Sequence, residues 1–146
     1  MVRGVGGWLL FLCISLTVLA PLAILSGLNL EVEFAQQITG QYPTFATALM
    51  YVTLFRLVLV YLSIRAGVLL WKKKAGAVSK AQTFLVTYAA YSLLLICLPY
   101  FGDLPPGPQE IVRNAFGISA MRTLVYTIVW HQYLTRSVRV RNTFTA

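Results

Sequence analysis

The stretch YVTLFRLVLVYLSIRAGVLLW, residues 51–71, decides the fold class, because it is a nearly continuous apolar run long enough to cross a bilayer. A membrane-spanning helix needs about 20 predominantly apolar residues. The run also contains two arginines, Arg56 and Arg65, whose charges are costly inside hydrocarbon. No acidic residue lies in any apolar span of the chain, so the first question is what these two arginines bind.

The composition of the whole chain agrees with a membrane protein. Of its 146 residues, 58% are hydrophobic and 11% are charged, whereas a soluble domain has about 45–50% apolar and about 25% charged residues. The net charge of +8 fits basic loops that face an anionic leaflet, and we do not expect nucleic acid as a partner. The sequence has no zinc-type cluster, phosphate-binding glycine loop or nucleophile elbow. We therefore expect neither a metal nor another cofactor.

Four apolar stretches predict an all-α protein, a single domain of four transmembrane helices in an up-down bundle. The expected helices are residues 8–27, 45–71, 84–101 and 115–134, followed by a basic tail, residues 135–146. The first stretch could instead be a signal peptide, because Arg3 precedes it. Its apolar run is longer than the roughly 7–15 residues of a signal core and ends in no clear cleavage site. We therefore interpret it as a helix of the bundle.

The charges are distributed unequally between the two sides of the predicted membrane. Eight of the twelve basic residues lie on one side. They are Arg3, Lys72, Lys73, Lys74, Lys80, Arg136, Arg139 and Arg141. All four acidic residues, Glu31, Glu33, Asp103 and Glu110, lie on the other side. The positive-inside rule then predicts that both termini and the loop 72–80 are cytoplasmic.

The outer loops differ in character. Residues 28–44 contain LEVEF, in which apolar residues alternate with Glu31 and Glu33, and this alternation favours a short extended segment. An irregular loop at the membrane interface fits the same residues equally well. Residues 102–110, GDLPPGPQE, predict a rigid proline-rich turn before the last helix.

The depth of the two arginines follows from the helix rise of about 1.5 Å per residue. Measured from Lys72, Arg65 lies about 10 Å deep and Arg56 about 24 Å deep, in a core about 30 Å thick. Side chains lean toward the N-terminus of their helix, which is the outer end here. Arg56 can therefore snorkel to the outer interface. Arg65 leans away from the nearer interface and is the better candidate for a functional residue.

The fourth predicted helix repeats this spacing with Arg122 and His131. Measured back from Arg136, they lie about 21 Å and about 7 Å deep. If the second and fourth helices are neighbours, an outer layer holds Arg56 and Arg122, with access to the acidic residues of the outer loops. An inner layer holds Arg65, His131 and Gln132, with Ser63 as a further candidate. Such layers would bind an anion, for example a lipid phosphate or a carboxylate; the alternative is snorkelling and hydrogen bonds to carbonyl groups. His131 is the only histidine, and we interpret it as a structural interfacial residue.

The C-terminal tail, YLTRSVRVRNTFTA at residues 133–146, is basic. Val138 and Val140 alternate with Arg139 and Arg141, which favours an extended conformation after the last helix. The simpler interpretation is a polybasic tail on anionic lipid.

The two ends of the chain resemble a known family. GVGGWLLFLCISLTVLAPL, residues 4–22, and YLTRSVRVRNTF, residues 133–144, are similar to the signature ends of a bacterial inner-membrane family, domain-of-unknown-function family 2569. In that family a Gly-Gly-Trp segment opens the first helix, and a tail like Ser137, Arg139, Val140, Thr143 and Phe144 follows the last. The resemblance implies a multi-pass protein of the bacterial inner membrane and no particular activity.

Both signature ends lie on the predicted cytoplasmic side. Gly4, Gly6 and Gly7 permit a tight backbone before Trp8. We hypothesise that the glycine segment and the arginine tail meet and form one surface that binds lipid headgroups or a partner.

Three classes of function remain. We favour a non-enzymatic accessory or scaffold protein that acts through lipid or protein partners at its basic cytoplasmic face, as a homo-oligomer or in a membrane complex. The alternative is a small transporter or an anion- or lipid-binding protein that uses the intramembrane arginines. A transporter would have to oligomerise, because one four-helix unit has no inverted repeat. We do not expect an enzyme, because paired carboxylates, a metal cluster and a nucleophile–base pair are not visible.

Overall fold

The structure, a computed structural model, describes residues 5–144, apart from the side chain of Leu30. These residues are helical almost throughout, and no strand occurs among them. The order is α1 (Trp8–Ile14), η1 (Ser15–Leu19), α2 (Ala20–Leu25), α3 (Leu28–Ile38), α4 (Pro43–Trp71), α5 (Ala77–Cys97), η2 (Leu98–Tyr100), α6 (Pro106–Arg136) and α7 (Val138–Phe144). The prediction of an all-α protein is confirmed.

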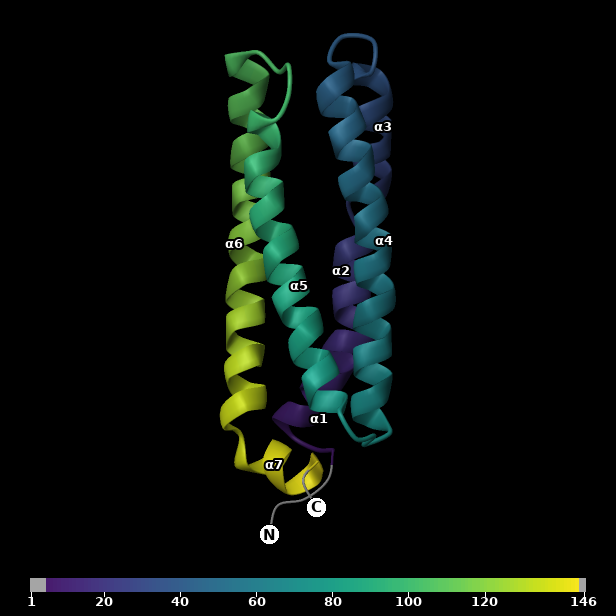
Figure 1. Ribbon diagram of the computed structural model, residues 1–146, viewed down its shortest axis with the longest axis vertical. Coiled ribbons are helices and arrows are strands. Elements are labelled where there is room, and N and C mark those ends of the chain that lie inside the picture. Colours follow the sequence, from purple (N-terminus) through teal and green to yellow (C-terminus); the bar gives the residue numbers. More distant parts are fainter. Residues whose placement is uncertain (1–4, 145–146) are drawn as a thin grey trace.

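The long helices run side by side along the long axis of the molecule (Figure 1). The elements α1, η1, α2 and α3, together called the first helical path, run along α4. The helix α5 lies between α4 and α6 and packs against both. The connection from α4 to α5, α1 and the short α7 lie at one end of the molecule. The connection from α5 to α6 and the end of α3 lie at the other end (Figure 1).

Three helical segments within residues 5–144 are long and apolar enough to cross a membrane. They are Trp8–Leu25, Pro43–Trp71 and Ala77–Tyr100, and they correspond to the first three expected helices. The helix α6 has 31 residues and is about 46 Å long, yet it is not among the three, because Arg122, His131 and Gln132 interrupt its apolar run. The helices α5 and α6 also begin before the expected residues 84 and 115, because each starts in a polar segment.

Residues 28–38 form the helix α3, so the prediction of an extended or irregular segment is wrong. The alternation in LEVEF covers only five residues, and a longer helical spacing overrides it. Glu31, Ala35 and Ile38 follow one another at this spacing. Ala35 and Ile38 are buried where α3 packs on α4.

The C-terminal tail is also helical, and the prediction of an extended tail is wrong. Of the tail residues up to Phe144, only Ser137, with ψ 122°, is extended, at the break between α6 and α7. Its hydroxyl accepts a hydrogen bond from the Val140 N–H at 3.4 Å, as a helix N-cap does. Val140 is buried, and α7 lies across the end of the bundle (Figure 1).

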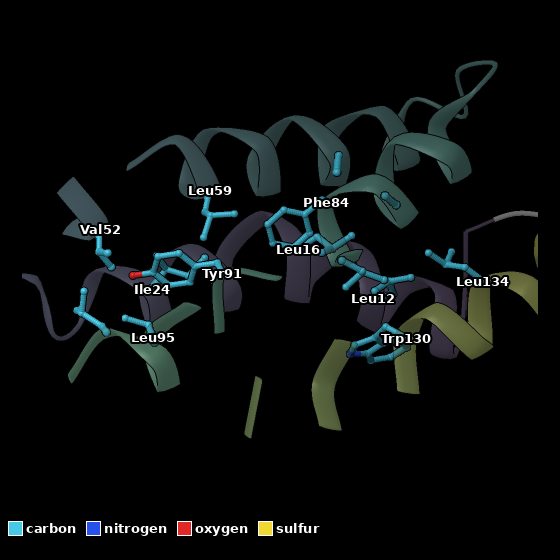
Figure 2. Packing of buried hydrophobic residues seen from close by; sticks show 14 of the residues in the cluster. Leu12, Leu16, Ile24, Val52, Leu59, Phe84, Tyr91, Leu95, Trp130 and Leu134 are labelled. Atoms are coloured by element: carbon cyan, nitrogen blue, oxygen red, sulfur yellow. The ribbon is translucent and has the colours of Figure 1, made fainter. Parts of the chain in front are cut away.

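The hydrophobic core lies between the first helical path, α4 and α5. Leu12 and Leu16 lie in the same part of it as Leu59 and Phe84, and Trp130 and Leu134 approach it from α6 (Figure 2). The outward faces of the long helices are apolar as well, with Leu54 on α4, Leu93 on α5 and other large apolar side chains exposed. Such extensive exposed apolar surface is what a bilayer covers.

Candidate functional site

Arg56 is buried between α3, α4 and α5, with 8% of its surface exposed. Its Nη2 donates a hydrogen bond to Glu31 Oε1 at 2.6 Å, and its Nε donates to the Tyr91 hydroxyl at 3.2 Å. The prediction that Arg56 snorkels to the interface is therefore wrong. The physical reason is that α3 packs along α4 and brings a carboxylate to the depth of the guanidinium.

Both oxygens of the Glu31 carboxylate accept hydrogen bonds. Its second carboxylate oxygen, Oε2, accepts a hydrogen bond from Thr53 Oγ1 at 3.4 Å. Tyr91 lies in the same part of the core as Ile24, Val52 and Leu95 (Figure 2). We call Arg56, Glu31, Tyr91 and Thr53 the Arg56 centre. Its two charges compensate each other, so it has no excess positive charge with which to attract an anion.

Of the two polar layers that the sequence predicted, the inner one does not form, whereas in the outer one Arg56 meets Glu31, one of the acidic residues expected there. Because α5 lies between α4 and α6, Arg65 on α4 and His131 on α6 are not brought together. Arg65 is exposed, and among residues 5–144 it has neither a hydrogen bond nor an ion pair. His131 is half-buried and borders a shallow pocket with Leu85 and Gln132. No group of three His, Cys, Asp or Glu side chains in the described residues could hold a metal ion.

Arg122, the fourth candidate, borders a groove of about 560 Å³ between the first helical path and α6. A smaller pocket of about 140 Å³ adjoins it and leads to Arg56 and Glu31. The two cavities share five lining residues, Ala23, Ser26, Tyr88, Ser119 and Thr123. The sequence identified Arg122 but gave no indication of the groove.

One wall of this groove includes a π-helical segment, η1, which sequence reasoning missed. A residue of α4 stabilises this π-helical segment, because the Ser63 hydroxyl donates a hydrogen bond to the Leu16 carbonyl at 2.6 Å. The Ser15 and Tyr126 hydroxyls, both in the lining of the groove, share a hydrogen bond of 2.7 Å that joins η1 to α6. The available signal was Pro21 inside the predicted span, since proline lacks the N–H that would bind the Thr17 carbonyl.

The predicted basic residues gather at the end of the molecule that carries the α4–α5 connection and α7. Six are exposed, namely Lys72, Lys73, Lys74, Lys80, Arg136 and Arg141, and Arg139 is half-buried. We call these seven residues the basic end; Arg3 lies outside the described residues. The four acidic residues lie in α3, in the connection before α6 and at the start of α6.

Gly6 and Gly7 meet Arg139 of the arginine tail at this basic end, as hypothesised, and Gly4 lies outside the described residues. A Cβ atom on Gly6 would lie 3.0 Å from Arg139 Nη1, and one on Gly7 would lie 3.3 Å from it. Gly7 also has a φ of 56°, which disfavours other residues. The guanidinium of Arg139 therefore lies close against the backbone of Gly6 and Gly7, and the φ of Gly7 favours glycine there.

A family model described as "Protein of unknown function (DUF2569)" matches residues 2–145. The chain is a DUF2569 protein. The match covers nearly the whole chain and not only the two ends that showed the resemblance. The family has no assigned activity. No curated protein and no solved structure matches it.

Proposed function

We propose that this DUF2569 protein is a four-span protein of the bacterial inner membrane with both termini and the α4–α5 connection in the cytoplasm. The three apolar segments support the first three spans. For the fourth, α6 is about 46 Å long and exposes Met121, Val125, Ile128 and Val129 on its outer face. The separation of basic and acidic residues to opposite ends supports the orientation.

Within this topology we propose a non-enzymatic accessory role, in which the basic end binds anionic lipid headgroups. The observation that carries this proposal is the packing of Arg139 on Gly6 and Gly7. It joins α7, which carries Arg139 and Arg141, to the start of the chain, at the end of the molecule where the α4–α5 connection with its lysines also lies (Figure 1). Each exposed basic residue near an anionic membrane surface contributes about 1 kcal/mol of attraction.

The experiment replaces three exposed lysines, Lys72→Gln, Lys74→Gln and Lys80→Gln, in one variant. Lys73 is kept, because its φ of 49° lies in the left-handed region. The protein is extracted from its membrane in polymer-bounded nanodiscs, and the ratio of anionic to zwitterionic lipid is measured. We expect the wild-type discs to be enriched in anionic lipid over the bulk membrane, and the triple variant to lose most of this enrichment.

The control for this experiment is Arg113→Gln, which removes a charge from the opposite end, where Arg113 pairs with Glu110 at 3.8 Å. Its discs should keep the wild-type lipid ratio. Equal ratios in the wild type and the triple variant would contradict the lipid proposal. A protein that copurifies with the wild type and is lost from the triple variant, at an unchanged lipid ratio, would establish an acidic protein partner instead.

A further inference from the structure

Arg122 is a charged residue without an internal partner. It is exposed on α6, and within the described part of the chain it makes neither a hydrogen bond nor an ion pair. It lies about 21 Å along the helix from Arg136, in the middle third of α6. Arg56, in contrast, is compensated by Glu31. Glu31 is thus unavailable to Arg122, and the groove that Arg122 borders keeps one uncompensated positive charge.

The groove is apolar at one end and polar at the other. At the end nearer α7, the rings of Phe11 and Trp130 lie with centroids 5.7 Å apart. At the other end, the side chains of Ser26, Ser119 and Arg122 line it. These two ends match the two parts of a lipid, its apolar chain and its polar headgroup.

The dimensions of the groove fit a lipid from one leaflet. Ser119 and Trp130 are separated by eleven residues of α6, about 16 Å along the helix, which is about half of a hydrocarbon core 30 Å thick. Its volume of about 560 Å³ lies within the range of about 300–1,000 Å³ found for small-molecule sites. A small soluble anion would leave the apolar end of the groove unfilled.

We propose that this groove binds one membrane lipid whose headgroup carries a net negative charge: its phosphodiester pairs with Arg122, while an acyl chain lies against Phe11 and Trp130. The planar guanidinium donates two parallel hydrogen bonds to such a headgroup. Because the polar end of the groove points away from α7, the lipid comes from the leaflet opposite the basic end. The site is therefore separate from the headgroup-binding surface proposed above.

The test measures binding of phosphatidylglycerol to the delipidated full-length protein in an uncharged detergent by native mass spectrometry. We expect one bound lipid per chain. Arg122→Gln should weaken binding at least about tenfold, since hydrogen bonds to charged groups contribute about 1.5–3 kcal/mol. Arg65→Gln is the matched control: it removes the same charge from an exposed intramembrane position without this groove, and binding should not change.

A second pair of variants tests the shape of the groove. Ala23→Phe fills a wall position that both cavities share, and it should also weaken binding. Leu22→Phe changes the neighbouring exposed residue, which lines neither cavity, and should not. If Arg122→Gln does not fold, as judged by helix content and gel filtration, this second pair decides the question.

Three results would overturn the proposal. The first is equal binding by Arg122→Gln and Arg65→Gln, or by Ala23→Phe and Leu22→Phe. The second is equally tight binding of zwitterionic phosphatidylcholine, which would remove the role of charge. The third is full competition by soluble glycerol phosphate, which would make the site an anion site without a lipid chain.

Discussion

At the scale of single residues, the ion pair between Arg56 and Glu31 joins α4 to α3 in the interior of the molecule. The side chains are 10% and 18% exposed. Two charges removed from water gain little net stability from each other, but one charge left alone in their place is strongly destabilising. The pair therefore ties the position of α3 to that of α4, and loss of either partner should release α3.

Glu31→Gln removes one of these charges and leaves Arg56 buried and uncompensated. We expect a loss of about 3–5 kcal/mol in the free energy of unfolding, as for other buried pairs from which one partner is deleted. Unfolding by denaturant in mixed micelles, followed by helix content, measures the effect. The control is Glu33→Gln on the exposed face of α3, which should change stability by less than about 0.5 kcal/mol.

A double variant separates this ion pair from other roles of Glu31. Glu31→Gln with Arg56→Met removes both charges and should recover most of the lost stability, since apolar replacements of buried pairs are often neutral or stabilising. A double variant as unstable as Glu31→Gln alone would show that the charge of Arg56 is not the cause.

At the scale of elements, the first helical path adapts to α4 through the π-helical segment η1. Ser63 binds the Leu16 carbonyl, and four residues later Gly67 lies against Thr17. A Cβ atom on Gly67 would collide with the Thr17 side chain and would lie 3.0 Å from its backbone nitrogen. The close approach of α4 to η1 thus depends on a glycine at this position.

Gly67→Ala should therefore destabilise the protein by about 1–3 kcal/mol, the range for overpacking of a close contact. Gly117→Ala is the matched control, because Gly117 lies inside α6 and a Cβ atom there meets nothing within 4 Å. That substitution should be neutral or stabilise the helix by up to about 1 kcal/mol. Thermal unfolding of both variants in the same detergent compares them; equal midpoints would contradict a tight contact at η1.

The short elements α3 and α7 show how local patterns can mislead. In both, apolar and charged residues alternate over four or five positions, which is the period of a strand. In both, tertiary packing favours a helix. Ala35 and Ile38 are buried where α3 packs on α4, and Val140 is buried where α7 lies across the end of the bundle. Ser137 before α7 was a helix start signal that the alternation obscured.

At the scale of the whole molecule, the two longest helices, α4 and α6, are longer than the hydrocarbon core of a bilayer is thick. The helix α4 has 29 residues, about 44 Å, against a hydrocarbon core of about 30 Å. It must tilt or extend into the headgroup regions at both ends. Its companion α6 is longer still, and its polar start, Pro106 to Asn114, lies at the acidic end of the molecule.

The proposed topology predicts which positions a membrane-impermeant thiol reagent reaches. In a Cys97→Ser background, where the remaining Cys13 is buried, we expect Gly107→Cys to be labelled from the outside of spheroplasts. Ser79→Cys and Val138→Cys should be labelled only after lysis. Labelling of Val138→Cys from the outside would show that α6 does not cross the membrane.

The sequence by itself determined the helical class, the apolar segments and the distribution of charges along the chain. Composition and hydropathy carry this information locally, since each apolar run fixes its own helix without reference to the others. The sequence also identified the arginines within its apolar stretches and estimated their depths in a predicted bilayer from the helix rise.

Only the tertiary structure decided which residues these arginines meet. The long helices are apolar on nearly all sides, so no apolar stripe identifies the face that packs on a neighbour. For this reason the sequence could not show that α5 separates α4 from α6, or which of the acidic residues near the outer end pairs with Arg56. The same packing places Arg122 beside a groove and Arg65 on an open face. In the sequence the two are alike, because each is an arginine within an apolar stretch.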